Sequence, residues 1–235
     1  MTPIIRFLTG ALFIFSGFIK ANDPMGFGYK LEEYFGVFGI TWLNPAATLL
    51  AVLICVVEMG LGLALLIGWR RMFTLWSLLA MIVFFTFLTF YSAWFNVVND
   101  CGCFGDFIKL TPWQSFTKDV VLLVFIGWLF FRRDHFKSFW SPDVRNRLVL
   151  AFVASSAIFS AYSWAYLPLI DFRPYAIGKS IAEGMKIPEG APLDQYEDTW
   201  YYKVDGEVKT YTTDQAPWDL PGAEFVDRKT VLVKK

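Results

Sequence analysis

Long apolar runs separated by short polar breaks dominate the first 170 residues of this chain. Residues 72–98 carry no charged side chain, and residues 148–170 carry none either. A helix needs roughly 20 predominantly apolar residues to cross the hydrocarbon core of a bilayer. The pattern therefore predicts an integral membrane protein whose spanning helices lie at about residues 3–21, 45–69, 72–96, 112–131 and 147–169.

The fourth of these segments has the shortest apolar stretch, because only residues 120–131 are strictly apolar. This helix is long enough to span only if it begins at Thr111-Pro112, a favourable cap and first-turn pair, and so includes Lys118 and Asp119. We expect Lys118 to extend toward the near end of the helix and Asp119 to face protein or water.

Basic residues are distributed unevenly between the two sets of loops. Arg70 and Arg71 separate the second and third segments, and residues 132–147 contain five more basic residues. The opposite loops, residues 22–44 and 99–111, are mixed or acidic. The positive-inside rule then predicts a cytoplasmic N-terminus, with both of these loops and the C-terminal tail outside. In a bacterium with two membranes, this places the protein in the inner membrane with a periplasmic C-terminus.

The character of the chain changes after Pro168, and residues 171–235 are polar and rich in turn residues. Asp205-Gly206 stands between two segments of alternating aromatic and β-branched residues, which predicts a hairpin. We expect its strands at Trp200–Val204 and Val208–Thr212, and a second short strand pair at Phe225–Val226 and Val231–Val233.

The predicted fold class is an all-α membrane protein, a four-helix transmembrane bundle plus a fifth transmembrane helix, followed by a small β-rich extracytoplasmic tail. The expected divisions are residues 1–140, 141–170 and 171–235. The tail has few apolar positions and ends within a strand pattern. We therefore expect it to be stabilised by packing against the membrane domain, a partner or a continuation of the chain. The net charge of zero gives no reason to expect a nucleic-acid partner.

Two of the three cysteines, Cys101 and Cys103, are separated only by Gly102 in the polar break before the fourth segment. A disulfide across one residue closes almost no loop, so it adds little stability, and its ring is tight. Strained disulfides are the labile ones used for exchange, and Gly102 tolerates the backbone angles that such a ring needs. The pair is therefore a candidate redox-active dithiol, with two free thiols in a turn as the alternative.

No metal is expected, because a zinc or iron–sulfur site needs about four ligands and the only histidine, His135, lies in a basic loop.

Two further polar or reactive residues fall inside the second segment. Cys55 is most simply a small buried hydrophobe, and the alternative is a relay thiol reached by the cysteine loop. Glu58 is an ionisable residue deep in the membrane, where such residues are costly and usually functional. It is a protonated carboxyl, a proton donor to a quinone, half of an ion pair with Lys118, or a structural hydrogen-bonding group.

Several of these residues together resemble a known family. Residues 1–140 resemble DoxX-like membrane proteins, and the MauE group is the nearest branch. The resemblance is carried by Glu58–Gly62 and by Cys101–Asp106 ahead of Lys118-Asp119. The resemblance implies a four-helix bundle and a link to the maturation of disulfide-rich partner proteins. The tail, beginning at Asp171–Tyr175, is similar to an extension in relatives from the Bacteroidota, which a thioredoxin-like part sometimes follows.

The function predicted from these features is a membrane thiol–disulfide redox protein, a candidate thiol:quinone oxidoreductase. Cys101 and Cys103 are its predicted catalytic cysteines, and Glu58 serves the reaction of a membrane quinone. The predicted cofactor-binding residues are Cys55, Lys118 and Asp119. The predicted partners are an extracytoplasmic thioredoxin-like or other thiol protein and the lipid bilayer.

Two rival functions remain open at this point. The first is a non-catalytic membrane subunit that anchors or assembles an envelope complex, in which residues 171–235 and 22–44 are the working surfaces. The second is a protein that handles a small solute or ion along a path of polar residues. Serine substitution at the loop cysteines abolishes function only under the redox hypothesis.

Overall fold

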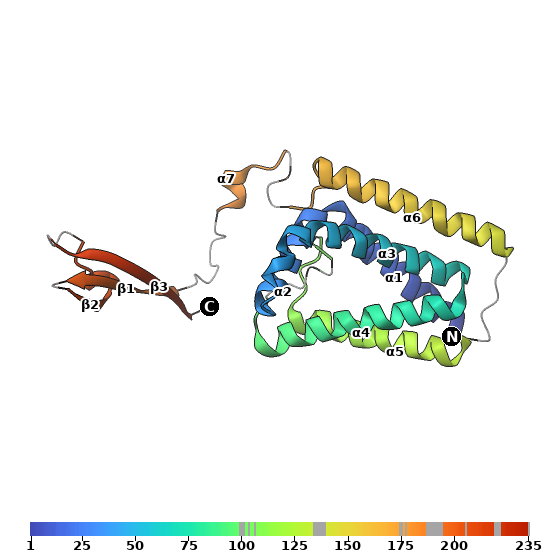
Figure 1. The fold of residues 1–235 in the computed structure, drawn as a ribbon, viewed down its shortest axis with the longest axis horizontal. Coiled ribbons are helices and arrows are strands. Elements are labelled where there is room, and N and C mark those ends of the chain that lie inside the picture. Colours follow the sequence, from blue (N-terminus) through green and yellow to red (C-terminus); the bar gives the residue numbers. More distant parts are fainter. Residues whose placement is uncertain are drawn as a thin grey trace. The chain divides into compact units, whose positions relative to one another are not determined.

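The computed structural model describes residues 1–98, 102, 104–105, 107–133, 140–173, 176, 178–186, 195–204, 206–218 and 222–234. The chain forms two compact units, Met1–Lys179 and Ser180–Lys235. The first unit is helical, and the second contains a small antiparallel sheet (Figure 1).

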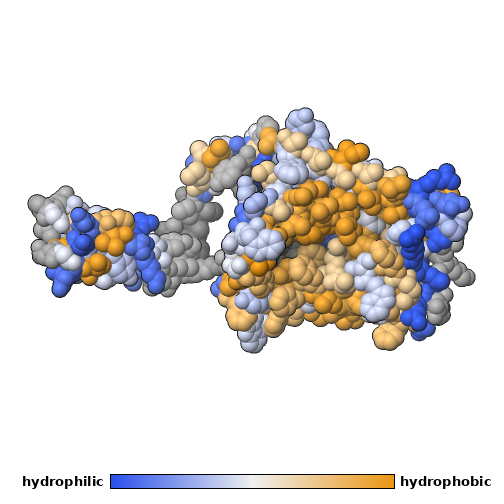
Figure 2. All heavy atoms as spheres, in the orientation of Figure 1, coloured by the Kyte–Doolittle hydropathy of each residue, from blue (hydrophilic) through white to orange (hydrophobic). Residues whose placement is uncertain are grey.

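In the part of the chain that the structure describes, five helices of the first unit are long and apolar enough to cross a membrane. They are α1 (Thr2–Asn22), α3 (Ala47–Ile67), α4 (Arg71–Phe95), α5 (Pro112–Phe131) and α6 (Pro142–Ala165). A 3-10 helix, η1 (Thr41–Ala46), leads directly into α3. The five predicted spans are thereby confirmed, and the chain is a multi-pass integral membrane protein. Figure 2 shows hydrophobic residues over the middle of this unit and hydrophilic ones gathered at the end where α4 and α6 begin.

The helix boundaries follow from local capping. The side chain of Thr111 accepts a hydrogen bond from the Gln114 amide, and the Gln114 side chain bonds back to Thr111, so α5 begins where predicted. Helix α6 begins earlier than expected because Ser141 caps it by accepting from the Val144 amide. It also ends earlier than expected, at Ala165. Pro168 disfavours the helical conformation at Leu167, the residue before it, so the helix cannot easily continue further.

The prediction of a loop over residues 22–44 was wrong, because α2 (Pro24–Val37) occupies much of it. The Asp23 side chain caps this helix by accepting from the Gly26 amide at 3.0 Å. Three glycines lower its helix propensity, which obscures the signal in the sequence. Phe27, Leu31 and Tyr34 nevertheless recur at helical spacing and are buried, so tertiary packing stabilises the helix.

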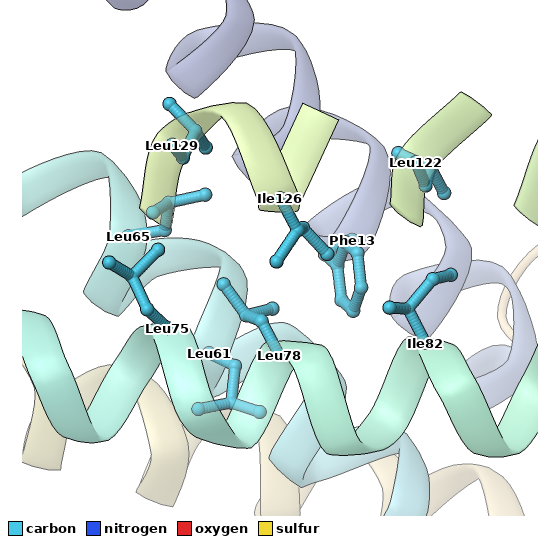
Figure 3. Packing of buried hydrophobic residues seen from close by; sticks show 9 residues of the cluster. All are labelled: Phe13, Leu61, Leu65, Leu75, Leu78, Ile82, Leu122, Ile126 and Leu129. Atoms are coloured by element: carbon cyan, nitrogen blue, oxygen red, sulfur yellow. The ribbon is translucent and has the colours of Figure 1, made fainter. Parts of the chain in front are cut away.

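Helices α1 and α3 approach each other closely through glycines. A Cβ on Gly62 would lie 2.7 Å from the Gly10 carbonyl oxygen, and one on Gly17 would lie 3.1 Å from the Cys55 carbonyl oxygen. Small residues at such crossings let membrane helices pack without side chains between their backbones. The main apolar cluster then joins α1 and α3 to α4 and α5 (Figure 3); its members are Phe13, Leu61, Leu65, Leu75, Leu78, Ile82, Leu122, Ile126 and Leu129.

Contacts between connecting segments show which of these segments lie together at each end of the bundle. At one end Arg71 donates to the Arg133 carbonyl at 3.0 Å, and Arg145 donates to the Gly68 carbonyl at 2.5 Å. At the other end Asn22 donates to the Ile170 carbonyl at 2.6 Å. The rings of Phe107 and Phe172 also meet there, with centroids 4.9 Å apart. The basic turns thus share one end, while α2, the α4–α5 connection and the chain after α6 share the other.

The second unit is a three-stranded antiparallel sheet with strand order β2-β1-β3. Its strands are β1 (Gln195–Val204), β2 (Glu207–Thr212) and β3 (Glu224–Lys234), accompanied by a short helix α7 (Ile181–Gly184) and a 3-10 turn η3 (Thr213–Gln215). The predicted hairpin is confirmed, because Val204 pairs with Glu207 across the two-residue turn.

The predicted second strand pair was wrong, since Phe225–Val226 and the residues after it belong to the single strand β3. The charged middle of this strand reads as a turn in the sequence. It stays extended because it makes polar cross-strand pairs with β1: Thr230 donates to Asp198 at 2.5 Å, and Thr199 faces Lys229. Aromatic rings support the sheet, with the centroids of Trp200 and Trp218 4.6 Å apart.

Candidate functional site

The two loop cysteines, Cys101 and Cys103, lie outside the described residues, as does His135. Their described neighbours are Gly102, Phe104 and Gly105. Gly102 has φ +64° and Gly105 has φ +48°, both in the left-handed region that favours glycine. Gly102 therefore has a backbone conformation that other residues rarely adopt, while its predicted role in a disulfide ring stays a prediction.

These loop glycines border a cavity of about 70 Å³ at the end of the bundle that α2 occupies, here named the end cavity. A Cβ on Gly102 would lie 3.1 Å from Lys30 Cγ, and one on Gly105 would lie 3.6 Å from Ile19 Cγ2. The end cavity thus combines basic, acidic and apolar groups; its lining residues are Ile19, Lys20, Asn22, Asp23, Gly26, Phe27, Lys30, Gly102, Gly105, Pro168, Ile170, Asp171, Phe172 and Arg173.

Asp171 and Arg173 form a bidentate pair on the wall of the end cavity. Arg173 donates from Nη2 to Asp171 Oδ2 at 2.7 Å and from Nε to Asp171 Oδ1 at 2.8 Å. Hydrogen bonding from the Arg173 side chain lowers the pKa of the Asp171 carboxyl from 3.8 to about 2. Asp171 is therefore a carboxylate at neutral pH, and the pair stabilises a local turn of the chain just after α6.

A second cavity of about 30 Å³ lies inside the bundle and is named the interior cavity. It has room for about two water molecules. Side chains from α1, α2, α3, α4, α5 and the cysteine loop converge on it; they are Leu12, Phe13, Ser16, Lys20, Phe27, Glu58, Ile82, Phe85, Phe104, Lys118, Asp119 and Leu122. Lys20 and Phe27 line both cavities, so these two side chains lie between the two spaces.

Lys20 and Glu58 form an ion pair beside the interior cavity, with Nζ 2.5 Å from Oε2 and both side chains buried. The ammonium also lies 5.1 Å from the Phe27 ring centroid and 4.9 Å from that of Phe85. Such contacts with opposite charge and aromatic faces compensate for the removal of an ammonium from water. Lys20 stands at the polar edge of the first segment, so its charge alone does not identify it as the partner of Glu58.

Lys118 and Asp119 form a second pair at the same cavity. Lys118 Nζ lies 2.5 Å from Asp119 Oδ1, and Thr89 donates to Asp119 Oδ2 at 3.0 Å. Asp119 is buried and faces protein, as expected. Of the alternatives open for Glu58, the structure shows an ion pair, but with Lys20 and not with Lys118, because the antiparallel crossing of α1 and α3 brings Lys20 to Glu58.

The third cysteine, Cys55, is fully buried. It belongs to a cluster of small and apolar residues with Ala21, Ala47, Ala51 and Met59. It lines neither cavity. The described part of the cysteine loop does enter the bundle, since Phe104 is buried, borders the interior cavity and lies under the Lys118 ammonium at 5.5 Å.

The arrangement places hydrogen-bond donors and proton-exchanging carboxyl groups in an apolar interior. Two ammonium groups and two carboxyl groups surround a space that Phe104 of the cysteine loop also borders, and Lys20 borders the end cavity as well. Such a site can bind an uncharged polar group by hydrogen bonds and can accept or release protons there.

Comparisons with known proteins follow the division into two units. The family model described as methylamine utilisation protein MauE matches residues 1–132. A model described as a domain of unknown function (DUF8463) matches residues 196–235. Protein TlpB of Flavobacterium psychrophilum is 26% identical over 216 residues, which cover 89% of this chain and 57% of that protein. The chain thus spans little more than half the length of this curated relative. No solved structure matches the chain.

Proposed function

This chain belongs to the MauE family, and we propose that it is a membrane thiol–disulfide redox protein whose working cysteines are Cys101 and Cys103. One observation carries the proposal. Gly102, between the two cysteines in the sequence, borders the end cavity, while Phe104, directly after them, borders the interior cavity. The described loop residues therefore connect an opening at the end of the bundle with a buried polar site.

The end cavity provides the side on which a thiol partner is proposed to dock. Lys20, Lys30 and Arg173 contribute positive charge to its walls. Positive charge near a thiol favours the thiolate, which is the reactive species in disulfide exchange. The proposed partner is a thioredoxin-like or other thiol protein on that side of the membrane.

The basic turns at the opposite end of the bundle indicate how the protein is oriented in the membrane. Arg71 and Arg145 lie at the end of the bundle away from the cysteine loop. The positive-inside rule favours a cytoplasmic location for such an end. We therefore place the N-terminus in the cytoplasm of a bacterium and the loop and tail in the periplasm.

A membrane quinone is the proposed second redox partner. Oxidation of the dithiol forms one S–S bond, breaks two S–H bonds and releases two electrons and two protons. Reduction of a quinone to its quinol takes up the same two electrons and two protons, so the exchange balances in either direction. Glu58 is the proposed proton-exchanging group, and Lys118 and Asp119 are proposed to line the quinone site.

The test is the in-cell thiol state of Cys101 and Cys103, measured by acid quench, alkylation and mass shift before and after a pulse of reductant. We expect a mixed population of dithiol and disulfide that recovers rapidly after the pulse. We also expect Cys101→Ser or Cys103→Ser to accumulate a mixed disulfide with a partner through the remaining loop cysteine. Cys55→Ser is the matched control, because it changes a buried cysteine that borders neither cavity.

A single thiol state that ignores both the pulse and the serine substitutions contradicts the proposal. The protein then acts as a non-catalytic subunit of an envelope complex, and deletion of residues 180–235 becomes the decisive variant, since these residues form a separate compact unit.

A further inference from the structure

A lipid-facing groove runs between α3 and α4, with a volume of about 380 Å³. This volume falls within the range of ordinary ligand sites. The side chains that form it are apolar with one exception; they are Ile54, Val57, Leu61, Ser77, Ala80, Met81, Phe84 and Phe85. The surface over α3 and α4 is correspondingly hydrophobic in Figure 2.

Phe85 is common to the groove and the interior cavity. Its ring is partly buried, and its centroid lies 4.9 Å from the Lys20 ammonium. The Phe85 side chain therefore borders both an apolar groove open to the bilayer and the cavity that contains the Lys20–Glu58 pair.

We infer that the groove is the lateral route and tail site of a membrane quinone, with Phe85 as the gate to a headgroup site at Lys20 and Glu58. This inference rests on the proposed thiol:quinone function and assigns its second site. The interior cavity itself holds only about 30 Å³, so the quinone ring requires the volume that Phe85 vacates.

The charges of the interior cavity favour a quinone over a phospholipid as the occupant. Ammonium groups donate to carbonyl oxygens, and the paired carboxyl groups exchange the protons of quinone reduction. Each ammonium group is already paired with a carboxyl group, so the site offers no net positive charge to a phospholipid phosphate and suits an uncharged quinone ring better. Glu58 also lies 11 residues into α3, about 16 Å along its axis, far deeper than a phospholipid headgroup resides.

The experiment is photolabelling of the full chain in phosphatidylcholine nanodiscs with an azido-quinone that carries a short isoprenoid tail. Labelled peptides are mapped by mass spectrometry, with decylubiquinone and phosphatidylglycerol as unlabelled competitors. The protein is fully reduced and no thiol partner is present, so the result does not depend on thiol exchange. We expect label on α3 and α4 residues of the groove, displaced by decylubiquinone but not by phosphatidylglycerol.

Groove-filling variants give the quantitative test. Ala80 is exposed in the groove, so Ala80→Trp is expected to weaken quinone binding about tenfold by occupying the tail site. Ala154→Trp makes the same change at an exposed position of α6 outside the groove, and we expect binding like that of the wild type. Ser77→Trp is a second groove variant for use if Ala80→Trp lowers the melting temperature.

Several results overturn the inference. These are wild-type affinity in both groove variants, label spread equally over all spanning helices, or displacement by phosphatidylglycerol as effective as by decylubiquinone. If quinone binds as expected while the loop cysteines show no turnover in cells, the site assignment stands and the thiol function fails, so the two failures are distinguishable.

Discussion

Lys20 Nζ lies 2.5 Å from Glu58 Oε2 across the crossing of α1 and α3, and both side chains are buried. The two residues come from elements that are antiparallel and held at backbone contact by Gly10, Gly17 and Gly62. The ion pair is therefore a consequence of glycine packing, which brings an end residue of one helix to the middle of the other. Lys20 borders both the end cavity and the interior cavity, whereas Glu58 borders the interior cavity.

Removal of one member of this pair leaves the other charge buried without compensation. We expect Lys20→Met to lower the free energy of unfolding by roughly 3–5 kcal/mol, and the double variant Lys20→Met/Glu58→Leu to recover most of that loss. The measurement is denaturant unfolding in detergent. Lys30→Met is the matched control, because Lys30 pairs with Glu33 on the surface and such pairs contribute about 0–1 kcal/mol. A double variant as unstable as Lys20→Met contradicts the expected coupling.

The five spanning helices are predictable from the sequence because uncharged runs of bilayer length have few alternative structures. The start of α5 is predictable for a local reason, since the Thr111 capping box involves only neighbouring residues. The hairpin of the tail follows in the same way from Asp205-Gly206 and the alternating residues around it. In each case the determining interactions are close in sequence.

The candidate site was only partly predictable, because its contacts join residues far apart in sequence. Glu58 and Asp119 attract attention by their charge inside apolar segments, but the partner of Glu58 depends on the α1–α3 crossing. A signal for Lys20 does exist: Phe13, Ser16 and Lys20 recur at helical spacing, and all three border the interior cavity. Helix α2 escaped prediction because its glycines mask an amphipathic pattern, which packing against α3 and α4 stabilises.

The glycine crossing predicts a strong dependence on residue size. A Cβ on Gly62 would lie 2.7 Å from the Gly10 carbonyl oxygen, a backbone atom that cannot rotate away. We expect Gly62→Ala to separate α1 from α3 and to lower the free energy of unfolding by about 1–3 kcal/mol. Gly127→Ala in α5 is the matched control, since a Cβ there meets nothing within 4 Å, and it is expected to be neutral or stabilising by up to about 1 kcal/mol. Equal effects in thermal or denaturant unfolding contradict the role of the crossing.

The burial of Cys55 predicts a packing role for this thiol. We expect it to resist a membrane-permeant alkylating reagent in the folded protein and to react after unfolding, because it is fully buried. Cys55→Ala leaves a small cavity, so we expect it to lower the free energy of unfolding by about 1 kcal/mol. It should leave the redox behaviour of the loop cysteines unchanged. Loss of that redox behaviour, with stability retained, would instead identify Cys55 as a relay thiol.

The Asp171–Arg173 pair predicts a specific response to acid. Hydrogen bonding from Arg173 lowers the pKa of Asp171 from 3.8 to about 2, so the pair favours the folded state above pH 3.8 and loses this contribution as the pH falls from 3.8 through about 2. Arg173→Gln removes the charged donor, and we expect the Asp171 carboxyl to titrate near its ordinary value. Carbon-13 NMR of labelled aspartate, with Asp171→Asn to assign the signal, measures both midpoints. An unchanged midpoint in Arg173→Gln would show that Arg173 does not hold the carboxylate, and the turn after α6 would then lack the proposed stabilisation by this pair.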